Sequence, residues 1–402
     1  MSQGRFVLLV LDGLGVGEMP DVKENRPQDI GSNTLKNIIQ NNPKIEIPNL
    51  RKLGIVDYFL NNKFKNSKFS SYQLSLGKFL LAHYGADSFV GHQEISGTRP
   101  KKPLQQFIID KKDEIIAILK KNNIDAKYTR GIILIKNNIA ISDNIESDYG
   151  FNISLVGSLD TNSFEKITSI AKIVRQVVQV GRVITMGGVN VDEKRLFSCI
   201  EHKTINGKEV YGINVPKLNI YNKDYLVVHL GTTILIEKQA PQILSKNNYP
   251  VVLIGKAADI ISADKAMYFP LVHTEEVIDC LIDKIDKIDK GLIFANVQET
   301  DLSGHRRDVL EFSRHLELVD KAIPKILKRL GKNDVFVITG DHGNDPTIGH
   351  PFHTREFTPL IMFSNNISSK DFGVRKTLAD IGASICKYFS LGSTESGTSF
   401  IP

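Results

Sequence analysis

Short, continuous runs of apolar residues recur towards both ends of the chain. They occupy residues 6–11, 251–254, 291–297 and 335–338. A parallel strand that is covered on both faces has no polar side, so it shows an unbroken apolar run rather than alternation. Segments with the apolar spacing of helices, such as 275–288 and 309–330, lie between the runs. This order predicts an α/β fold with a mostly parallel sheet flanked by helices.

The pattern changes between residues 98 and 222. Asn162 and Glu165 form a capping-box pattern ahead of an apolar face at residues 167–178. An Asn206-Gly207 pair separates two strand-like runs, which is the signature of a hairpin. We therefore predict an inserted α+β cap domain at 98–222, within a core formed by 1–97 and 223–402.

Aspartate and histidine follow three of the apolar runs. Because parallel strands end at the same edge of a sheet, side chains far apart in sequence can meet there. Each residue alone could be an ordinary turn or capping residue, but together carboxylates and imidazoles suit divalent metal ions. We predict a two-metal site, and the candidate ligands are Asp12, Asp301, His305, Asp341, His342 and His353.

Ser88 lies in a segment that is too rich in glycine and polar residues to be predicted as core. One interpretation is a helix-capping serine. The other is a nucleophile, because two divalent ions about 3.5–4 Å apart can activate a hydroxyl and neutralise a phosphoryl group. With six candidate ligands elsewhere in the chain, phosphoryl transfer is the favoured chemistry.

Composition argues against several classes of partner. The 402 residues are 41% hydrophobic and 24% charged, which is ordinary for a soluble globular protein. The net charge of +6 is spread along the chain, so no nucleic-acid partner is expected. The apolar run at 6–11 is far shorter than the roughly 20 residues of a membrane span, so no membrane partner is expected. The three cysteines show no paired spacing, which favours a reducing cytoplasm.

Several motifs in this order resemble the alkaline phosphatase superfamily and its cofactor-independent mutases. The motifs at residues 304–308, 341–347 and 353–356 are most similar to those of the phosphopentomutase family. Gly255-Lys256 and Asp29-Ile30-Gly31 also fit that family. Asp12-Gly13 and the segment from Asp87 to His92 resemble the superfamily, but Ser88 stands where phosphopentomutases usually have Thr and phosphoglycerate mutases have Ser. The resemblance implies an alkaline-phosphatase-like core with a cap domain.

The resemblance also implies a site and a reaction. One ion would be held by Asp301, His305 and His353, and the other by Asp12, Asp341 and His342. Manganese is expected, with zinc or magnesium as alternatives. Ser88 would carry the phosphoryl group between the 1- and 5-positions of ribose or deoxyribose phosphate, with a sugar bisphosphate as activator. Lys256 and His92 would support substrate binding.

The chain departs from the family at three points. Gly349-His350-Pro351-Phe352 replaces the family's approach to His353, so an acidic residue is missing there. The Arg-rich cap segment expected after Arg182 is not recognisable, and Arg195 is the nearest candidate for substrate binding. The spacing from Asp301 to His305 resembles that of phosphoglycerate mutases. A mutase for another phosphorylated metabolite, or a metal-dependent phosphohydrolase, is therefore the alternative hypothesis. A non-catalytic binding protein is disfavoured, since every candidate ligand and Ser88 is present.

Overall fold

The computed structural model describes residues 4–99, 101–146, 149–205, 207–220, 224–231 and 234–402. The chain divides into two compact units, a core unit of Met1–Pro100 with Leu235–Pro402 and an inserted unit of Lys101–Ile234. The expected boundary of the inserted domain at residue 222 lies outside the described residues. Strand β11 (Leu226–Gly231), which follows that point, pairs with β8 (Arg182–Gly188) in the inserted unit.

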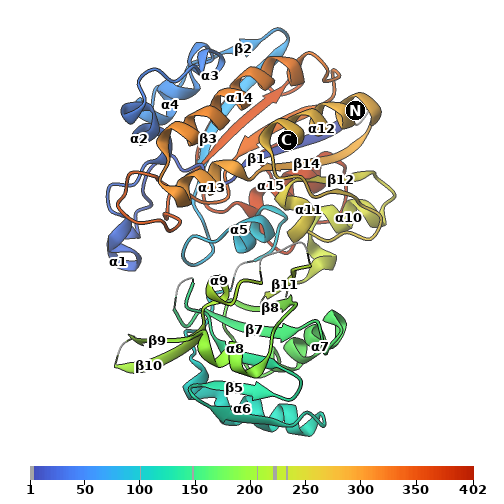
Figure 1. Ribbon diagram of the computed structural model, residues 1–402. Helices are drawn as coiled ribbons and strands as arrows, with labels where there is room; N and C mark the ends of the chain where they lie inside the picture. The colour runs from blue at the N-terminus through green and yellow to red at the C-terminus, as the bar shows by residue number, and fades with distance from the viewer. Residues whose placement is uncertain (1–3, 100, 147–148, 206, 221–223, 232–233) are drawn as a thin grey trace. The chain divides into compact units, whose positions relative to one another are not determined.

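The core unit is built on one nine-stranded sheet with the order β13-β12-β14-β1-β15-β16-β3-β17, and β2 pairs with β3 (Figure 1). Its first five strands in this order are all parallel, whereas β16 is antiparallel to both β15 and β3. The predicted mostly parallel α/β sheet is therefore confirmed. The strands are β1 (Arg5–Leu11), β2 (Lys68–Phe69), β3 (Tyr72–Phe79), β12 (Val251–Ile254), β13 (Met267–Phe269), β14 (Gly291–Val297), β15 (Val335–Thr339), β16 (Thr358–Ser364) and β17 (Asp371–Arg375).

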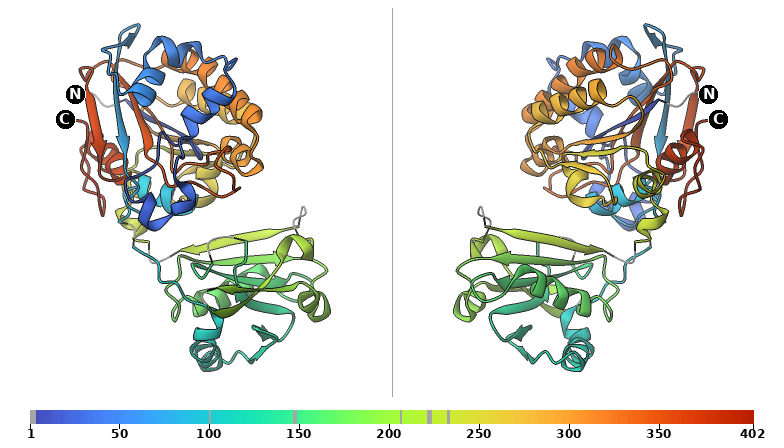
Figure 2. Two further views of the ribbon diagram at one scale, coloured as in Figure 1. Left: turned by 90° about the vertical axis from the view of Figure 1, so that its left-hand side faces the viewer. Right: turned by 90° about the vertical axis from the view of Figure 1, so that its right-hand side faces the viewer.

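Strand β1 lies between β14 and β15 and is buried along its whole length. Its side chains alternate between two apolar clusters, with Val7 and Leu9 in one and Phe6 and Leu8 in the other. Helices cover both faces of the sheet (Figure 2). This double cover explains the unbroken apolar run in the sequence.

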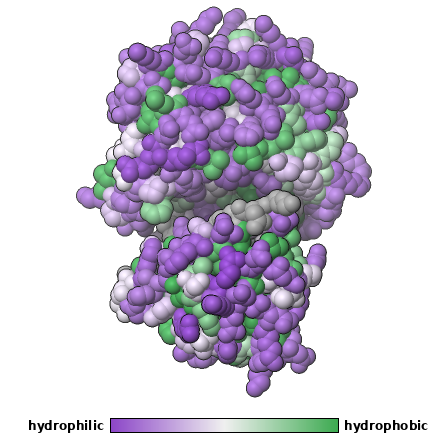
Figure 3. Space-filling view, in the orientation of Figure 1, coloured by the Kyte–Doolittle hydropathy of each residue, from purple (hydrophilic) through white to green (hydrophobic). Residues whose placement is uncertain are grey.

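Helices α2, α3, α4, α12 and α14 contribute to the first cluster, and α5, α10, α11 and α15 contribute to the second. The surface in the region of α14 is mainly hydrophilic, as expected for helices with one apolar face (Figure 3). The helices are α1 (Val22–Asn25), η1 (Pro27–Asp29), α2 (Thr34–Asn41), α3 (Pro48–Lys52), α4 (Ile55–Asn61), α5 (Ser88–Ile95), η2 (Ile236–Lys238), α10 (Ala240–Lys246), α11 (Lys256–Ile260), α12 (Thr274–Lys287), α13 (Glu299–Arg306), α14 (Val309–Leu327) and α15 (Ala379–Tyr388).

The inserted unit contains a six-stranded sheet with the order β11-β8-β7-β6-β5-β4, in which only the β7–β8 pairing is parallel among the described strands. Helices α6 and α7 pack on one face, and α8 and α9 pack on the other. A separate hairpin is formed by β9 and β10. The elements are α6 (Ile108–Lys121), β4 (Ala126–Thr129), β5 (Ile132–Ile135), β6 (Ile139–Asp143), β7 (Asn152–Ser158), α7 (Phe164–Val174), α8 (Glu193–Ser198), β9 (Ile200–Ile205), β10 (Lys208–Ile213) and α9 (Val215–Leu218).

Two local predictions for this unit have different outcomes. The hairpin forms as predicted, although Asn206 lies outside the described residues. The predicted capping box at Asn162 is wrong, because Ser163 caps α7 and accepts a hydrogen bond from the backbone N–H of Lys166. Asn162 instead donates to the carbonyl of Asn137, a partner in a preceding loop that the local pattern could not reveal.

Across the described residues, no helix is both long and apolar enough to cross a membrane.

Candidate metal centre

Polar side chains gather at the carboxyl edge of the parallel strands in the core unit. Asp12 follows β1, and Asp341 follows β15 by two residues. Lys256 begins α11 immediately after Gly255, which has φ +68°. A Cβ at this glycine would lie 2.2 Å from the carbonyl oxygen of Asn296. The tight turn therefore requires glycine, and it brings Lys256 to the same edge as the carboxylates.

Ser88 is the first residue of α5, and its hydroxyl oxygen lies among charged groups. It is 3.1 Å from Asp12 Oδ1, 2.7 Å from His342 Nε2 and 3.0 Å from Lys256 Nζ. Asp87, rather than Ser88, caps the helix by accepting from the backbone N–H of Val90. The capping interpretation of Ser88 is therefore wrong.

The prediction that this segment is not core is also wrong. Ser88, His92 and Glu94 are all buried, because α5 packs directly against the turn that carries Asp341. A Cβ on Gly91 would lie only 2.8 Å from the Asp341 carbonyl oxygen. The glycine content that suggested a loop instead permits this close packing.

All three predicted histidine ligands share one arrangement. In each, Nδ1 lies within hydrogen-bonding distance of a backbone carbonyl, so Nδ1 carries the proton and Nε2 is free to bind a metal ion. The acceptors are the carbonyls of Gly343 for His342 (2.9 Å), Ala86 for His353 (3.0 Å) and Pro351 for His305 (2.7 Å). The backbone therefore fixes the tautomer that a metal ligand needs.

The structure brings all six predicted ligands together. Two groups have donor atoms that all lie within 4.8 Å of one another, namely Asp301 with His342 and His353, and Asp12 with His92 and Asp341. Both groups differ from the triads that the family resemblance implies. His305 stands beside the first group, with Nε2 3.0 Å from His353 Nε2. His342 Nε2 also lies 3.5 Å from Asp12 Oδ1 and 3.3 Å from Asp341 Oδ2, so His342 borders both groups.

The donor set fits divalent cations. Three buried carboxylates face a single ammonium group, Lys256, which is 2.8 Å from Asp12 Oδ2 and 3.4 Å from Asp301 Oδ2. Two imidazole Nε2 atoms 3.0 Å apart repel each other unless a proton or a cation lies between them. Carboxylate oxygens and imidazole nitrogens are the ligands that zinc and manganese share.

Electrostatics pull the aspartate pKa values apart. Burial, together with Asp341, raises the pKa of Asp12 to about 7. Burial also acts to raise the pKa of Asp341, but His342 and His92 outweigh it and hold that pKa below its ordinary range. Lys256 and His353 outweigh burial in the same way at Asp301, whose pKa is well below its ordinary value.

The pKa values of two histidine ligands, His342 and His353, also differ widely. Burial lowers the pKa of His342 to about 3. At His353 burial acts in the same direction, but Asp301 outweighs it and raises the pKa to about 9. Neighbouring ionisable groups with separated pKa values are typical of functional sites.

Sequence reasoning missed two asparagines that hold the carboxylates. Asn296 on β14 donates from Nδ2 to Asp12 Oδ2 (3.1 Å) and lies 2.8 Å from His92 Nε2. Asn344 donates from Nδ2 to Asp301 Oδ1 (2.8 Å). Asn296 interrupts an apolar run, and a polar residue in a buried strand needs a hydrogen-bond partner, so the sequence offered a signal for Asn296. Asn344 lies among the other polar residues of the metal motif, where it offered no such signal.

Arg355 and Glu356 do not lie in the metal centre, but they hold neighbouring segments together through hydrogen bonds. The guanidinium of Arg355 donates to the carbonyls of His83 and Gly85, which precede Ser88. Glu356 accepts from the backbone N–H and the hydroxyl of Thr34. Arg355 thus attaches the segment that carries His353 to the loop that leads into α5, and Glu356 attaches the same segment to the start of α2.

Arg195 occupies a different setting from the other predicted site residues. It lies in α8 of the inserted unit, and its guanidinium donates to the backbone carbonyls of Asn190 and Leu218. Both bonds are local to that unit. A role of Arg195 in substrate binding stays a prediction.

Fold and site together define a metal-dependent enzyme, and comparison with known proteins agrees. Residues 4–393 match the sequence profile of the metalloenzyme superfamily. The chain is 30% identical to a phosphopentomutase of Alkaliphilus oremlandii over 98% of both chains. It is 29% identical to a phosphopentomutase of Caldanaerobacter subterraneus, over 99% of this chain and 97% of the relative.

The chain thus belongs to the metalloenzyme superfamily and, within it, to the phosphopentomutase family. The family predicted from the motifs is confirmed, as is the class of enzyme, a metal-dependent phosphomutase. The fold is also similar to that of a phosphoglycerate mutase from Leishmania mexicana, with a TM-score of 0.51 and 11% identity over 99% of this chain and 97% of that one. At that identity the likeness concerns the fold alone.

Proposed function

We propose that this phosphomutase interconverts the 1- and 5-phosphates of ribose or deoxyribose, with Ser88 as the phosphoryl carrier. One observation carries the proposal: the Ser88 hydroxyl oxygen lies between Asp12, His342 and Lys256, at 2.7–3.1 Å from each. The substrate class comes from the relatives, which are phosphopentomutases over nearly the full chain.

Two divalent ions complete the proposed site. Asp301, His305 and His353 would hold one, and Asp12, Asp341 and His342 would hold the other, with manganese as the proposed metal. When bound, the ions supply positive charge that acidifies a hydroxyl and neutralises phosphoryl oxygens.

Residues of the chain stabilise the developing charge and position the reacting groups. The Lys256 ammonium donates to Ser88 Oγ and stabilises negative charge that develops there. Ser88 begins α5, so a phosphoryl group on its oxygen lies at the positive end of the helix dipole. Asn296 holds the carboxylate of Asp12, and Arg355 fixes the loop that leads to Ser88.

The proposed reaction has two transfers. Phospho-Ser88 gives its phosphoryl group to the free hydroxyl of a pentose monophosphate, and the sugar becomes a bisphosphate. The other phosphate then returns to Ser88, which leaves the isomeric monophosphate and regenerates the phosphoenzyme. A sugar bisphosphate is therefore the proposed activator of unphosphorylated enzyme. We assign the inserted unit the task of excluding water, because water would hydrolyse the phosphoenzyme.

The cytoplasm is the proposed compartment, and the free thiols of Cys199, Cys280 and Cys386 support it.

Direct assay of the interconversion tests the proposal. Manganese-loaded protein, primed with a pentose bisphosphate, is incubated with ribose 1-phosphate, and ³¹P NMR follows the appearance of ribose 5-phosphate. Parallel reactions contain 3-phosphoglycerate or a generic phosphate ester. We expect interconversion of the pentose phosphates with little release of inorganic phosphate. Turnover of the glycerate alone, or net hydrolysis, would refute the substrate or the mutase reaction respectively.

A further inference from the structure

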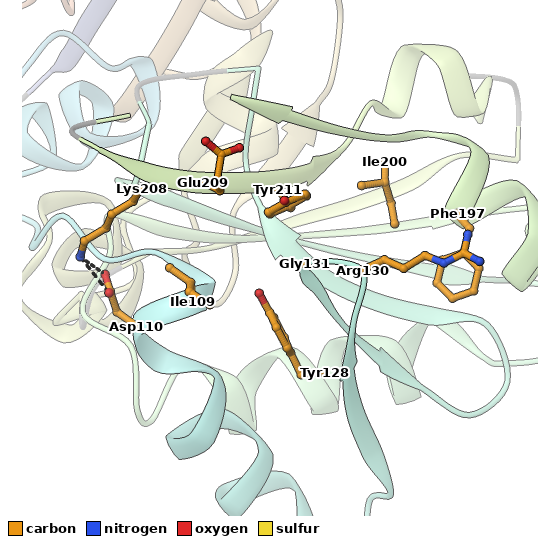
Figure 4. A pocket seen from close by; sticks show the side chains of 10 residues that line it. All are labelled: Ile109, Asp110, Tyr128, Arg130, Gly131, Phe197, Ile200, Lys208, Glu209 and Tyr211. Carbon is orange, nitrogen blue, oxygen red and sulfur yellow. Dashed lines mark hydrogen bonds and ion pairs between the residues drawn. The ribbon is translucent and has the colours of Figure 1, made fainter. Parts of the chain in front are cut away.

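The inserted unit carries a hollow of about 710 Å³ that is lined by residues of that unit alone. It lies between the start of α6, the β4–β5 turn, α8 and the β9–β10 hairpin (Figure 4). Its volume is within the range of about 300–1,000 Å³ that is usual for small-ligand pockets. None of its lining residues takes part in the chemistry proposed above.

Aromatic rings form the walls of this hollow. Tyr128 on β4 points towards Tyr211 on β10, and Phe197 of α8 lies beside Arg130 (Figure 4). Gly131 makes room for Tyr211, because a Cβ at this position would lie 2.1 Å from the Tyr211 ring. The Tyr211 ring therefore packs against the bare backbone of Gly131, and it also stacks on His202, with ring centroids 5.6 Å apart. Tyr128 is thus the aromatic side chain of the hollow that can receive a flat ligand.

The β4–β5 turn places a cation in the hollow at a conformational cost. Arg130 has φ +50° and Gly131 has φ +85°. A two-residue hairpin turn with two positive φ angles favours Asn-Gly or Asp-Gly, and a non-glycine residue with a long side chain is disfavoured there. An arginine held in this conformation points to a use for its side chain.

The guanidinium of Arg130 has no carboxylate partner among the described residues. It lies over the ring of Phe197, 4.3 Å from the centroid. Lys208, by contrast, is neutralised by Asp110 at 2.7 Å, and Glu209 accepts a hydrogen bond from the Thr204 hydroxyl. Among the described lining residues, Arg130 is therefore the cation without a carboxylate partner, and stacking on Phe197 orients its planar donors.

We propose that this hollow binds a nucleoside monophosphate, with the base against Tyr128 and the phosphate on Arg130. Aromatic faces bind bases by stacking, and a guanidinium binds phosphate through paired hydrogen bonds. The ligand class thus combines a flat ring with a phosphate group, as the two kinds of lining residue require.

The test uses the full chain, loaded with metal, and adenosine monophosphate as the probe. Calorimetry measures the affinity, and hydrogen exchange locates the protected segments. We expect protection at residues 126–131, 197–205 and 207–211. Adenosine and inorganic phosphate, which each lack half of the ligand, should bind more weakly in this region.

Arg130→Asn is the decisive variant. Asparagine tolerates positive φ better than arginine, so the variant should fold at least as well while losing the cation. We expect its affinity for adenosine monophosphate to fall by about tenfold or more, with mutase activity unchanged. Lys127→Asn removes an exposed positive charge from the adjoining strand and should leave the affinity unchanged.

Three results would overturn the proposal. They are failure of adenosine monophosphate to protect these segments at millimolar concentration, unchanged affinity in Arg130→Asn, and equal Arg130-dependent binding of inorganic phosphate. Each of them is independent of whether the pentose phosphates are substrates.

Discussion

The Ser88 hydroxyl is the group on which the proposed chemistry depends. Ser88→Ala removes the oxygen that carries the phosphoryl group in the proposed reaction, and it leaves the six candidate ligands in place. We expect turnover to fall by more than about 10³-fold, whereas two divalent ions per chain still bind. Initial rates of pentose phosphate interconversion and metal content after dialysis measure the two effects.

A second serine in the same helix segment provides the control. Ser96 is buried at the end of α5, and its hydroxyl donates to the carbonyl of His92. Ser96→Ala should cost about 1 kcal/mol of stability and keep most of the activity. Normal turnover in Ser88→Ala would refute the role of Ser88 as the carrier.

At the scale of elements, the distance between α5 and the Asp341 turn depends on Gly91. Gly91→Ala adds a Cβ 2.8 Å from the Asp341 carbonyl oxygen, so the helix or the turn must move. Alanine favours helix by about 1 kcal/mol, but displacement of Ser88 relative to Asp12 and Lys256 should lower kcat, by up to about 10²-fold. Steady-state kinetics and thermal unfolding separate the two effects.

Gly392→Ala is the matched control, because a Cβ at Gly392 meets no atom within 4 Å. It should change neither kcat nor stability appreciably. Full activity in Gly91→Ala would show that the close packing of α5 is not needed for the reaction.

Asp143 makes the stability of the inserted unit depend on pH. It ends β6 and accepts a hydrogen bond from the backbone N–H of Ile108 at the start of α6 (3.0 Å). Burial raises the pKa of this carboxyl group to about 7, although backbone N–H groups of Ile108 and Tyr211 oppose the rise. The pKa in the unfolded chain is about 3.9. The folded state therefore holds the proton in this range, and its stability falls as the pH rises from about 4 to 7.

Asp143→Asn should remove this pH dependence while keeping an oxygen that accepts from Ile108. The difference in unfolding free energy between wild type and variant should change with a slope of up to about 1.4 kcal/mol per pH unit. Denaturant unfolding of both proteins between pH 5 and 8 measures that slope. Asp125→Asn removes an exposed carboxylate of the same unit and serves as the control. A constant difference between wild type and Asp143→Asn would contradict the prediction.

At the scale of the whole molecule, metal binding should stabilise one unit and not the other. All six proposed ligands belong to the core unit. Because an ion that binds only the folded state stabilises it by mass action, manganese at 100 times its dissociation constant should add about 2.7 kcal/mol. Chelation should reverse the gain. Hydrogen exchange should show the added protection in residues 4–99 and 235–402, and little change in the inserted unit.

Asp341→Asn, which removes one proposed ligand, should lose most of this gain. Equal protection of both units, or none in either, would contradict the assignment of the metal ligands to the core unit.

The sequence by itself determined the central parallel strands of the core and the candidate metal ligands and nucleophile. Apolar runs located β1, β12, β14 and β15, because a strand buried on both faces leaves a local pattern that needs no knowledge of its neighbours. Asp12 and Asp341 were predicted as metal ligands because each follows such a run, and parallel strands share one carboxyl edge. Helix α13, which carries Asp301 and His305, went unpredicted because its residues are mostly polar.

Only the tertiary structure decided how these residues are used. The burial of Ser88, the Nδ1–H tautomers of His305 and His353, and the hydrogen bond from Asn296 to Asp12 all depend on groups distant in sequence. The same holds for Arg195, whose guanidinium is bound to the carbonyl of Leu218 in another element. Short-range patterns reflect local conformation and burial, whereas a hydrogen bond between distant segments exists only after packing has brought them together.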